Sequence, residues 1–145
     1  MAAGSERVVF RQDVVVSPDG LQMIAAADEV FNHVDTDEFM WTGTGGRRVE
    51  VPISFARPFV STPLVVLGLT GIDSSQSENL RFNLTAEDVT GQGFTIVFVT
   101  WDDTRIARAS ASWTAIGREV VTRKPAGGPR GMAGKPALAT SSEGD

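Results

Sequence analysis

Hydrophobic and polar residues alternate with a period of two over the middle of the chain. From Arg47 to Gly117, β-branched and aromatic residues are grouped between turn signals, as half-buried antiparallel strands require. We therefore predict strands at 48–55, 64–69, 80–85, 94–101 and 106–116.

Three of these strands carry information about their place in a sheet. Pro52 has no N–H to donate, so the strand around it lies at an edge or carries a bulge. The run Leu64–Leu69 is apolar on both faces, which predicts a central strand. In the strand 106–116, four alanines share one face with Trp113, a pattern typical of two closely packed sheets. Five or six short strands without a convincing helix among them indicate an antiparallel β-sandwich.

The first forty residues follow a different pattern. Val8–Val16 is a candidate strand, and Ser17–Gly20 reads as a turn. The apolar positions that follow fit one side of a short helix: Leu21, Ile24, Ala27, Phe31 and Val34. A helix of this length is marginal alone, so it packs either on the sandwich or on another chain.

The last residues differ again in composition. Residues 122–145 are rich in Pro and Gly, carry an excess of basic over acidic residues and have few large apolar side chains. Such a segment buries too little surface to offset its chain entropy, which predicts a flexible tail or an arm ordered on a partner. The chain thus divides into an N-terminal extension for attachment or oligomer packing (1–40), a sandwich (41–121) and this tail (122–145).

Composition excludes several classes of function. The 145 residues include no Cys and one His, His33, which removes thiol chemistry and any Cys- or His-rich metal site. The net charge of -5 argues against nucleic acid as a partner. We see no signal peptide and no apolar run long enough to enter a membrane, and we expect no cofactor. The location stays open, with the cell exterior or a phage-like particle as candidates.

Four local motifs resemble functional sites, but each is better explained without that function. The stretch Thr42–Arg47 is Gly-rich but lacks the ending of a phosphate loop, so a hairpin or a loop leading into a strand is expected. Asp35–Glu38 starts like a calcium loop without its Gly, and the sequon at Asn83 falls inside a strand. Asp102 and Asp103 are adjacent and should diverge, which argues against a glycosidase pair. His33 is expected at a surface or interface, outside the sandwich, and we predict no enzyme.

A binding constellation remains around the end of the fourth predicted strand. Trp101 precedes the turn that begins with Asp102, and Arg81 opens another strand. The flat face of an indole packs against the C–H face of a sugar, while Arg and Asp form hydrogen bonds with the hydroxyl groups of the sugar. The alternative is structural: Trp101 lies in the core and Arg81 pairs with Asp73 or Asp102.

The order of residues resembles the H-type lectins from Trp41 to Gly117. The resemblance rests on Ile53–Phe59, Asn79-Leu80-Arg81, Thr100-Trp101 with Thr104, and Ser112-Trp113. It implies a six-stranded antiparallel β-sandwich that assembles into a parallel homotrimer. It also implies sites for N-acetylgalactosamine or galactose at the junctions between protomers.

Carried over position by position, the resemblance gives a modified sugar site. Arg81 and Trp101 match the family's sugar-binding Arg and Trp. Asp102 stands where that family has a His, Ala107 stands where it has a stacking Tyr, and Thr44 falls near its acidic loop residue. Asp102 then serves as acceptor for vicinal hydroxyls, and Arg105 or Arg108 meets acidic groups on a polysaccharide. These departures predict a specificity altered from N-acetylgalactosamine or galactose.

The predicted function is multivalent recognition of cell-surface glycans or polysaccharides by a homotrimer. The expected carbohydrate-binding residues are Arg81, Trp101, Asp102, Thr44 and Arg105, with no metal. The alternative is a structural or adaptor protein of a larger assembly, such as a phage-like tail or spike, that keeps the trimer without binding sugar.

Overall fold

The computed structural model describes residues 2–6 and 8–121. The predicted tail at 122–145 lies outside the described residues. The chain runs through these elements in order: β1 (Ala2–Ser5), β2 (Asp13–Val16), β3 (Leu21–Asn32), α1 (Phe39–Thr42), β4 (Arg47–Ser54), β5 (Leu64–Ser74), β6 (Asn83–Glu87), β7 (Gly93–Thr100) and β8 (Ile106–Arg118).

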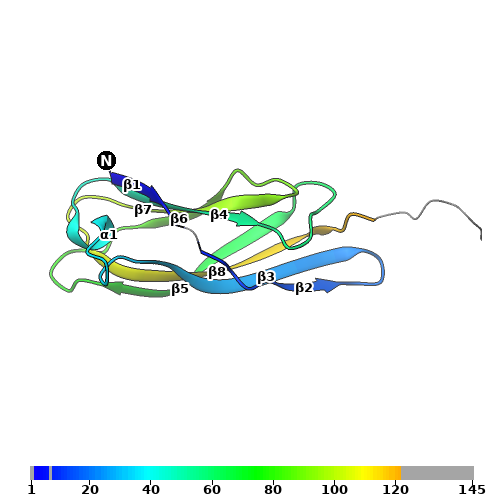
Figure 1. The fold of residues 1–145 in the computed structure, drawn as a ribbon, viewed down its shortest axis with the longest axis horizontal. Coiled ribbons are helices and arrows are strands. Elements are labelled where there is room, and N and C mark those ends of the chain that lie inside the picture. The colour runs from blue at the N-terminus through cyan, green and yellow to red at the C-terminus, as the bar shows by residue number, and fades with distance from the viewer. Residues whose placement is uncertain (1, 7, 122–145) are drawn as a thin grey trace, which may run out of the picture.

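The strands form two sheets that pack face to face (Figure 1). The first sheet has the order β1-β4-β7-β6, and the second has the order β2-β3-β8-β5. Strands β3 to β8 pair antiparallel, three in each sheet, which confirms the predicted six-stranded sandwich. Strands β1 and β2 extend the two sheets by one strand each, and β1 runs parallel to β4.

The helix expected from residue 21 onward is wrong, because this segment is the long strand β3. It pairs with β8 from Leu21 to Asn32, and its buried residues alternate with exposed ones up to Ala27. A bulge between Glu29 and Phe31 then shifts the register, so that both Val30 and Phe31 are buried. Before the bulge, apolar residues lie on both faces of the strand, with Leu21, Met23 and Ala27 exposed, and this mixture resembled the spacing of a helix.

The core forms where the alanine face of β8 meets the first sheet. Ala107, Ala109, Ala111, Trp113 and Ala115 are all buried, as the alternation predicted. The indole of Trp113 occupies the space above the small residues, with its ring 5.3 Å from that of Phe94 and 5.8 Å from that of Phe55. Small side chains on one strand thus let one large ring fill the space between the sheets.

Strand β5 forms an edge of the second sheet, so the central position that its sequence suggested is wrong. Among the described strands of this sheet it pairs with β8 alone. Val65 and Leu67 pack against the core, whereas Leu64 and Val66 point outward and are 65% and 56% exposed. An apolar outer face explains the run of hydrophobic residues without a second neighbouring strand.

The edge position or bulge predicted for the strand around Pro52 is wrong for the strand as a whole, because β4 lies between β1 and β7 and pairs with β7 in unbroken register. Pro52 itself lies in a stretch of β4 without a described partner on one side. Strand β1 pairs with β4 only from Arg47 to Glu50, and the N–H of Glu6 donates to the carbonyl of Glu50 (2.8 Å). The next residue of β4 that faces β1 is Pro52, which has no N–H to continue the ladder. The proline thus ends the parallel pairing.

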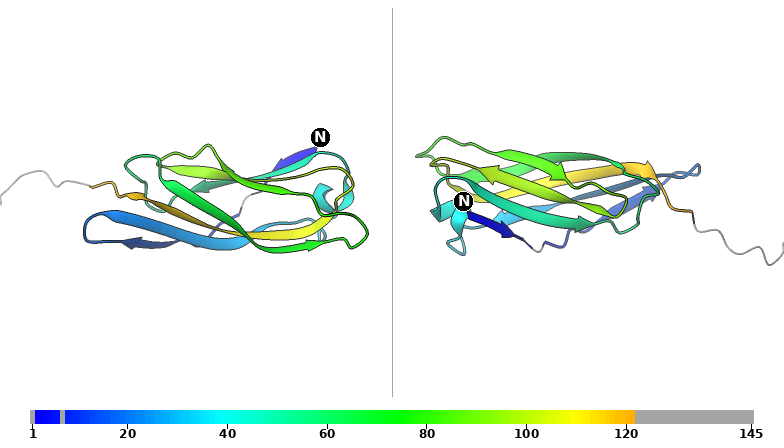
Figure 2. Two further views of the ribbon diagram at one scale, coloured as in Figure 1. Left: turned by 180° about the vertical axis from the view of Figure 1, so that it is seen from behind. Right: turned by 90° about the horizontal axis from the view of Figure 1, so that it is seen from above.

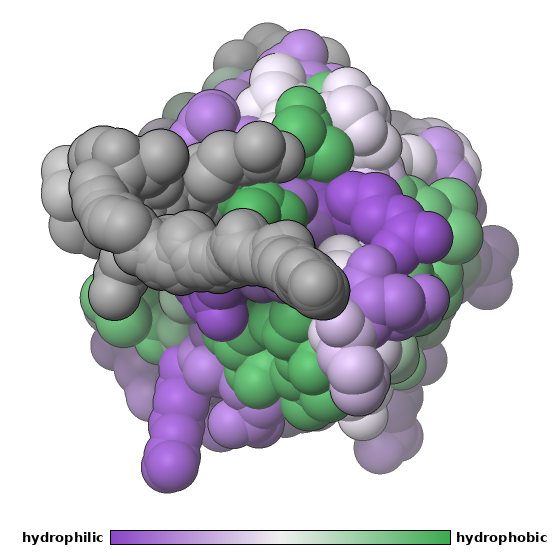
Figure 3. Space-filling model, turned by 90° about the vertical axis from the view of Figure 1, so that its right-hand side faces the viewer, coloured by the Kyte–Doolittle hydropathy of each residue, from purple (hydrophilic) through white to green (hydrophobic). Residues whose placement is uncertain are grey.

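Loops gather at the two ends of the sandwich. Helix α1 lies at one end, beside the connections β5–β6 and β7–β8, in all three ribbon views (Figure 2). We call this end of the molecule the loop end. Strand β8 leaves the sandwich at the opposite end, where hydrophobic and hydrophilic surface lie side by side (Figure 3). Within the described residues, no helix has the length and apolar character needed to cross a membrane.

Candidate functional site

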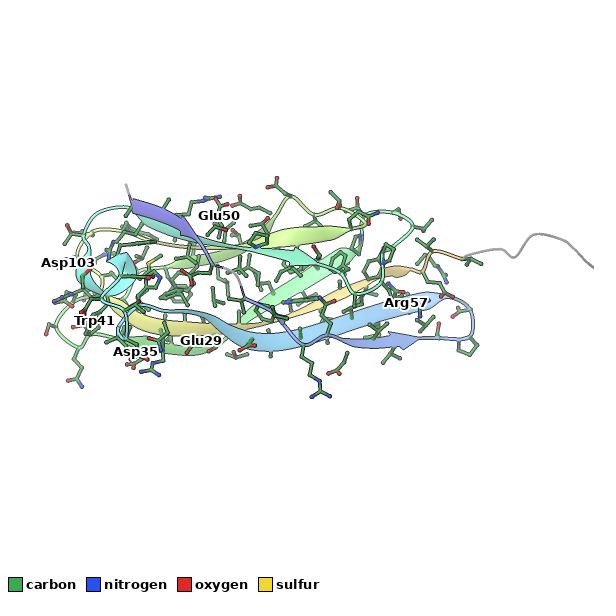
Figure 4. The ribbon with its side chains drawn as sticks, in the orientation of Figure 1. Glu29, Asp35, Trp41, Glu50, Arg57 and Asp103 are labelled. Atoms are coloured by element: carbon green, nitrogen blue, oxygen red, sulfur yellow. The ribbon has the colours of Figure 1, made fainter. Side chains whose placement is uncertain are left out.

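Three connecting segments meet at the loop end and are tied together by hydrogen bonds. They are residues 43–46 before β4, residues 75–82 before β6, and the turn 101–105 between β7 and β8. The N–H of Gly45 donates to the carbonyl of Asp102 (2.8 Å), and the N–H of Ser75 donates to that of Arg105 (2.9 Å). Segments far apart in the sequence thus form one surface, on which Asp103 and Trp41 both lie (Figure 4).

Arg81 is held in place by a network within this surface. Its Nη1 donates to Asp103 Oδ1 (2.7 Å), to Thr104 Oγ1 (3.1 Å) and to the carbonyl of Asn79 (3.3 Å). The hydroxyl of Thr104 in turn donates to the carbonyl of Asn79 (2.5 Å), and that of Thr100 donates to the carbonyl of Arg81. The guanidinium is therefore fixed in orientation before any ligand arrives.

Arg81 does pair with an aspartate, but its short contact is to Asp103 rather than to Asp73 or Asp102. The partner of Arg81 at hydrogen-bond distance is Asp103, whereas Asp102 Oδ2 is 3.9 Å from its Nη2. Asp73 instead faces Arg108 on the outer face of the second sheet (3.7 Å). The expected divergence of the two adjacent aspartates is wrong, because both carboxylates face the guanidinium of Arg81, at 2.7 and 3.9 Å.

Trp101 and Asp102 project from the turn into solvent. The Trp101 side chain is 42% exposed, so the alternative that places this residue in the core is wrong. Asp102 has a φ of 61°, in the left-handed region where Asp is better tolerated than most residues. Its carboxylate is 66% exposed. An indole and a carboxylate are thus presented side by side along the chain.

Arg47 is a site residue that the sequence reasoning missed. Its side chain is 1% exposed, and its guanidinium donates to the carbonyls of Gly45 (2.9 Å) and Asp102 (3.1 Å). It also reaches the carbonyls of Phe39 and Met40 in α1 (3.4 Å each). Burial lowers the pKa of Arg47, and the charge of Arg105 lowers it further. The available signal was its position in β4, on the same face as Val49 and Val51.

Thr44 and Arg105 flank this arrangement. Thr44 is exposed in the segment 43–46, whose Gly43 approaches the backbone of α1 so closely that a Cβ would lie 2.6 Å from the carbonyl oxygen of Phe39. The Nε of Arg105 donates to the carbonyl of Trp41 (2.9 Å), and its guanidinium lies 5.4 Å from the centre of the Trp41 ring. Arg105 is therefore held against Trp41 by a hydrogen bond and a cation–π contact.

The surface position predicted for His33 is wrong, because this residue is fully buried just after β3. Its Nε2 is 3.0 Å from Glu38 Oε1 and 3.3 Å from Glu6 Oε2, and these three residues could in principle ligate a metal. Its Nδ1, however, accepts the N–H of Met40 (3.1 Å), so a neutral imidazole carries its proton on Nε2. That proton faces the carboxylates of Glu6 and Glu38, which favours hydrogen bonds from the imidazole to them over a metal site.

The fold and the site together define a β-sandwich that presents an exposed aromatic, a fixed Arg and a free carboxylate on one loop surface. Comparison with known proteins shows which kind of domain this sandwich resembles. Residues 50–116 match the H-type lectin domain. This stretch is therefore identified as an H-type lectin domain, and the match supports a carbohydrate-binding module.

Individual relatives agree with this placement. Over 79 residues the chain is 33% identical to a discoidin-1 of Dictyostelium discoideum, covering 54% of this chain and 31% of that protein. Over 78 residues it is 50% identical to ATP synthase subunits region ORF 7 of Fuscovulum blasticum, covering 54% and 68%, a name that states no activity. The structure of discoidin II from Dictyostelium discoideum superposes with a TM-score of 0.60 at 21% identity, over 72% of this chain and 40% of that one, which supports the fold. The chain thus spans about a third of the length of the discoidin-1 that it matches.

Proposed function

We propose that the chain is a carbohydrate-binding module whose sugar site lies at the loop end. The observation that carries this proposal is that the exposed Trp101 opens the same turn whose Asp103 and Thr104 hold the guanidinium of Arg81 in place. The indole packs against the C–H face of a sugar, and the outer N–H groups of Arg81 donate to ring hydroxyls. Asp102 accepts hydrogen bonds from sugar hydroxyl groups, and Thr44 borders the site. Arg105 supports it through Trp41.

We further propose that the module acts as a homotrimer. A single shallow sugar site typically binds at about the millimolar level, or about 4 kcal/mol. Three sites that face one way increase the effective strength by about a hundredfold or more where their spacing fits a glycan-bearing surface. Binding to cell-surface glycans or polysaccharides thus depends on the oligomer.

The outer face of the second sheet supports self-association. Val15, Met23, Ile116 and Leu64 are in register across the sheet and form one apolar row. The neighbouring rows consist mostly of small side chains such as Ala25, Ala27, Ser112 and Thr114, which permit close approach of another copy. The outer face of the first sheet differs, because Arg48 forms ion pairs there with Glu50 (2.6 Å) and Glu87 (3.2 Å). The second sheet therefore has the face that favours a protein neighbour.

The oligomer can be tested apart from the sugar. We expect Met23→Glu to convert a trimer into monomers in light scattering, because it places a charge in the apolar row. Ser54→Glu, on the outer face of the first sheet, serves as the matched control and should leave the mass unchanged. A wild-type monomer would contradict the trimer.

Sugar binding is tested on a glycan array that includes bacterial surface polysaccharides. We expect the wild-type chain to bind, and Arg81→Ala and Trp101→Ala to lose binding at unchanged oligomeric mass. Arg57→Ala removes an Arg at the opposite end, paired with Glu119, and should bind normally. A trimer that binds no glycan would instead favour the adaptor function, in which the sandwich serves a larger assembly.

A further inference from the structure

The carboxylate of Asp102 has no hydrogen-bond partner among the described residues. Arg81 Nη2 is the cation recorded near it, at 3.9 Å, which is beyond hydrogen-bond distance. Asp103, the next residue, is by contrast bound to the same Arg at 2.7 Å. Asp103 therefore forms the short ion pair with Arg81, whereas Asp102, which follows the exposed Trp101 in the chain, approaches the same guanidinium only at longer range and keeps its hydrogen-bonding capacity for a ligand.

The backbone that carries this free carboxylate is fixed. The carbonyl of Asp102 accepts two hydrogen bonds, one from the N–H of Gly45 (2.8 Å) and one from Nη2 of Arg47 (3.1 Å). Asp102 has a left-handed φ of 61°, and its side chain is 66% exposed to solvent. A ligand that meets this carboxylate does not have to order the turn, which lowers the entropy cost of binding.

The balance of charge at this point is negative. Arg81, Asp102 and Asp103 sum to one negative charge, and Arg105 is directed to Trp41. Acidic residues also outnumber basic ones over the whole loop end, where the acids are Asp35, Asp37, Glu38, Asp73, Glu78, Asp102 and Asp103, and the bases are Arg47, Arg81, Arg105 and Arg108. A field of this sign repels sugar acids and attracts cations.

We propose that the site prefers amino sugars with a free ammonium group, and that Asp102 is the residue that determines this preference. The inference rests on the proposed sugar-binding function and specifies its ligand class. The ammonium group donates to the Asp102 carboxylate while the ring packs on Trp101. N-acetylation removes the positive charge, so the N-acetylated sugar loses the charge-assisted bond. A uronic acid places a like charge against Asp102 and binds more weakly still.

The test titrates the full-length chain with galactosamine, galactose, N-acetylgalactosamine and galacturonic acid at a pH that keeps the amine protonated. The three tryptophans give separate indole N–H signals in NMR, so the shift of Trp101 reports binding directly. Because Asp102 is largely solvent-exposed, we expect only about a threefold to tenfold preference for the amine over its N-acetyl form. The preference should shrink as salt is added.

Two variants assign the preference to Asp102. Asp102→Asn should reduce the ratio of the affinities for galactosamine and N-acetylgalactosamine to about one, at a weaker affinity for every sugar, because Asp102 also accepts from hydroxyl groups. Asp102→Gly, which also accepts a left-handed φ, should do the same. Asp37→Asn is the matched control, since Asp37 is an exposed aspartate of the loop end with a φ of 55°. Persistence of the preference in both Asp102 variants would overturn the inference.

The outcomes separate the two proposals. Wild-type binding of galactose with no gain for the amine overturns the amino-sugar inference and leaves the sugar site standing. Failure of every sugar to shift Trp101 overturns both.

Discussion

Replacing Arg47 by Met tests whether the loop end is organised by one buried guanidinium. Arg47 is 1% exposed and connects α1, the segment 43–46 and the turn at Asp102 through four backbone carbonyls. Met has a similar volume and no donor, so the substitution removes the hydrogen bonds with little change in packing. If these bonds organise the site, the variant loses stability and the turn becomes less ordered.

The size of the loss follows from the bond lengths. Two of the four bonds are short, at 2.9 and 3.1 Å, and two are long, at 3.4 Å. A hydrogen bond from a charged donor contributes about 1.5–3 kcal/mol, so the short pair supplies about 3–6 kcal/mol. Removing a guanidinium from water costs several kcal/mol, which offsets part of this gain. We therefore expect Arg47→Met to lower the free energy of unfolding by about 2–3 kcal/mol.

Urea unfolding, followed by circular dichroism at one fixed protein concentration, measures this change. Arg48→Met is the matched control, because Arg48 lies next to Arg47 but on the outer face of β4, in exposed ion pairs that contribute about 1 kcal/mol or less. Hydrogen exchange of the Gly45 amide, which bonds to Asp102, should be faster in the Arg47 variant alone. Equal stability of Arg47→Met and wild type would show that the desolvation cost cancels the gain from the hydrogen bonds and would refute the reasoning.

Three further predictions concern other parts of the fold. Trp113→Ala should lower the free energy of unfolding by about 3–5 kcal/mol, whereas Trp113→Phe should cost less, because the buried indole N–H has no partner to lose; equal losses in thermal or urea unfolding would contradict this. The hydrogen bond from the Ser17 hydroxyl holds the pKa of Asp19 below its ordinary value. The stabilisation that this bond gives the folded state is therefore present at neutral pH and is lost as pH falls through the lowered pKa. The difference in Tm between wild type and Ser17→Ala should narrow in acid, and a constant difference would argue against this. His33→Leu leaves the N–H of Met40 unpaired and should cost about 1–3 kcal/mol, and Zn²⁺ should not raise the Tm of the wild type, because Nε2 carries a proton; a rise in Tm that depends on His33 would show a metal site instead.

The sandwich could be predicted because the pleat imposes its period on the sequence. Along β4 and β8 buried residues recur at every second position, and the alanine face of β8 even indicated how closely the sheets approach. Strand β3 escaped the prediction because Leu21, Met23, Ala25 and Ala27 lie on its exposed face while Gln22 is buried, so hydrophobicity does not alternate with burial. Local pattern alone therefore identifies strands with one polar face and misses one whose two faces are both largely apolar.

Strand β5 shows a different limit of sequence reasoning. Hydrophobic residues on both faces indicate that both faces avoid water, but not which neighbour covers them. In this chain one face of β5 meets the core and the other forms part of the apolar row on the second sheet. A central strand and an edge strand with an apolar outer face therefore leave the same pattern in the sequence.

At the loop end, the sequence identified Arg81, Trp101 and Asp102 but not how charge is distributed among their neighbours. That distribution depends on the turn, in which Asp102 has a left-handed φ and both carboxylates face the guanidinium of Arg81, Asp103 at 2.7 Å and Asp102 at 3.9 Å. Asp103 then binds Arg81, and Asp102 is left without a hydrogen-bond partner among the described residues. Arg47 supports this residue through a hydrogen bond to its carbonyl. The alternation along β4 places Arg47 on the inner face of the strand, but it does not show that the guanidinium reaches the turn. A buried cation far from the turn in sequence thus holds the backbone of the residue whose carboxylate has no hydrogen-bond partner among the described residues, and no motif confined to the turn could have indicated this support.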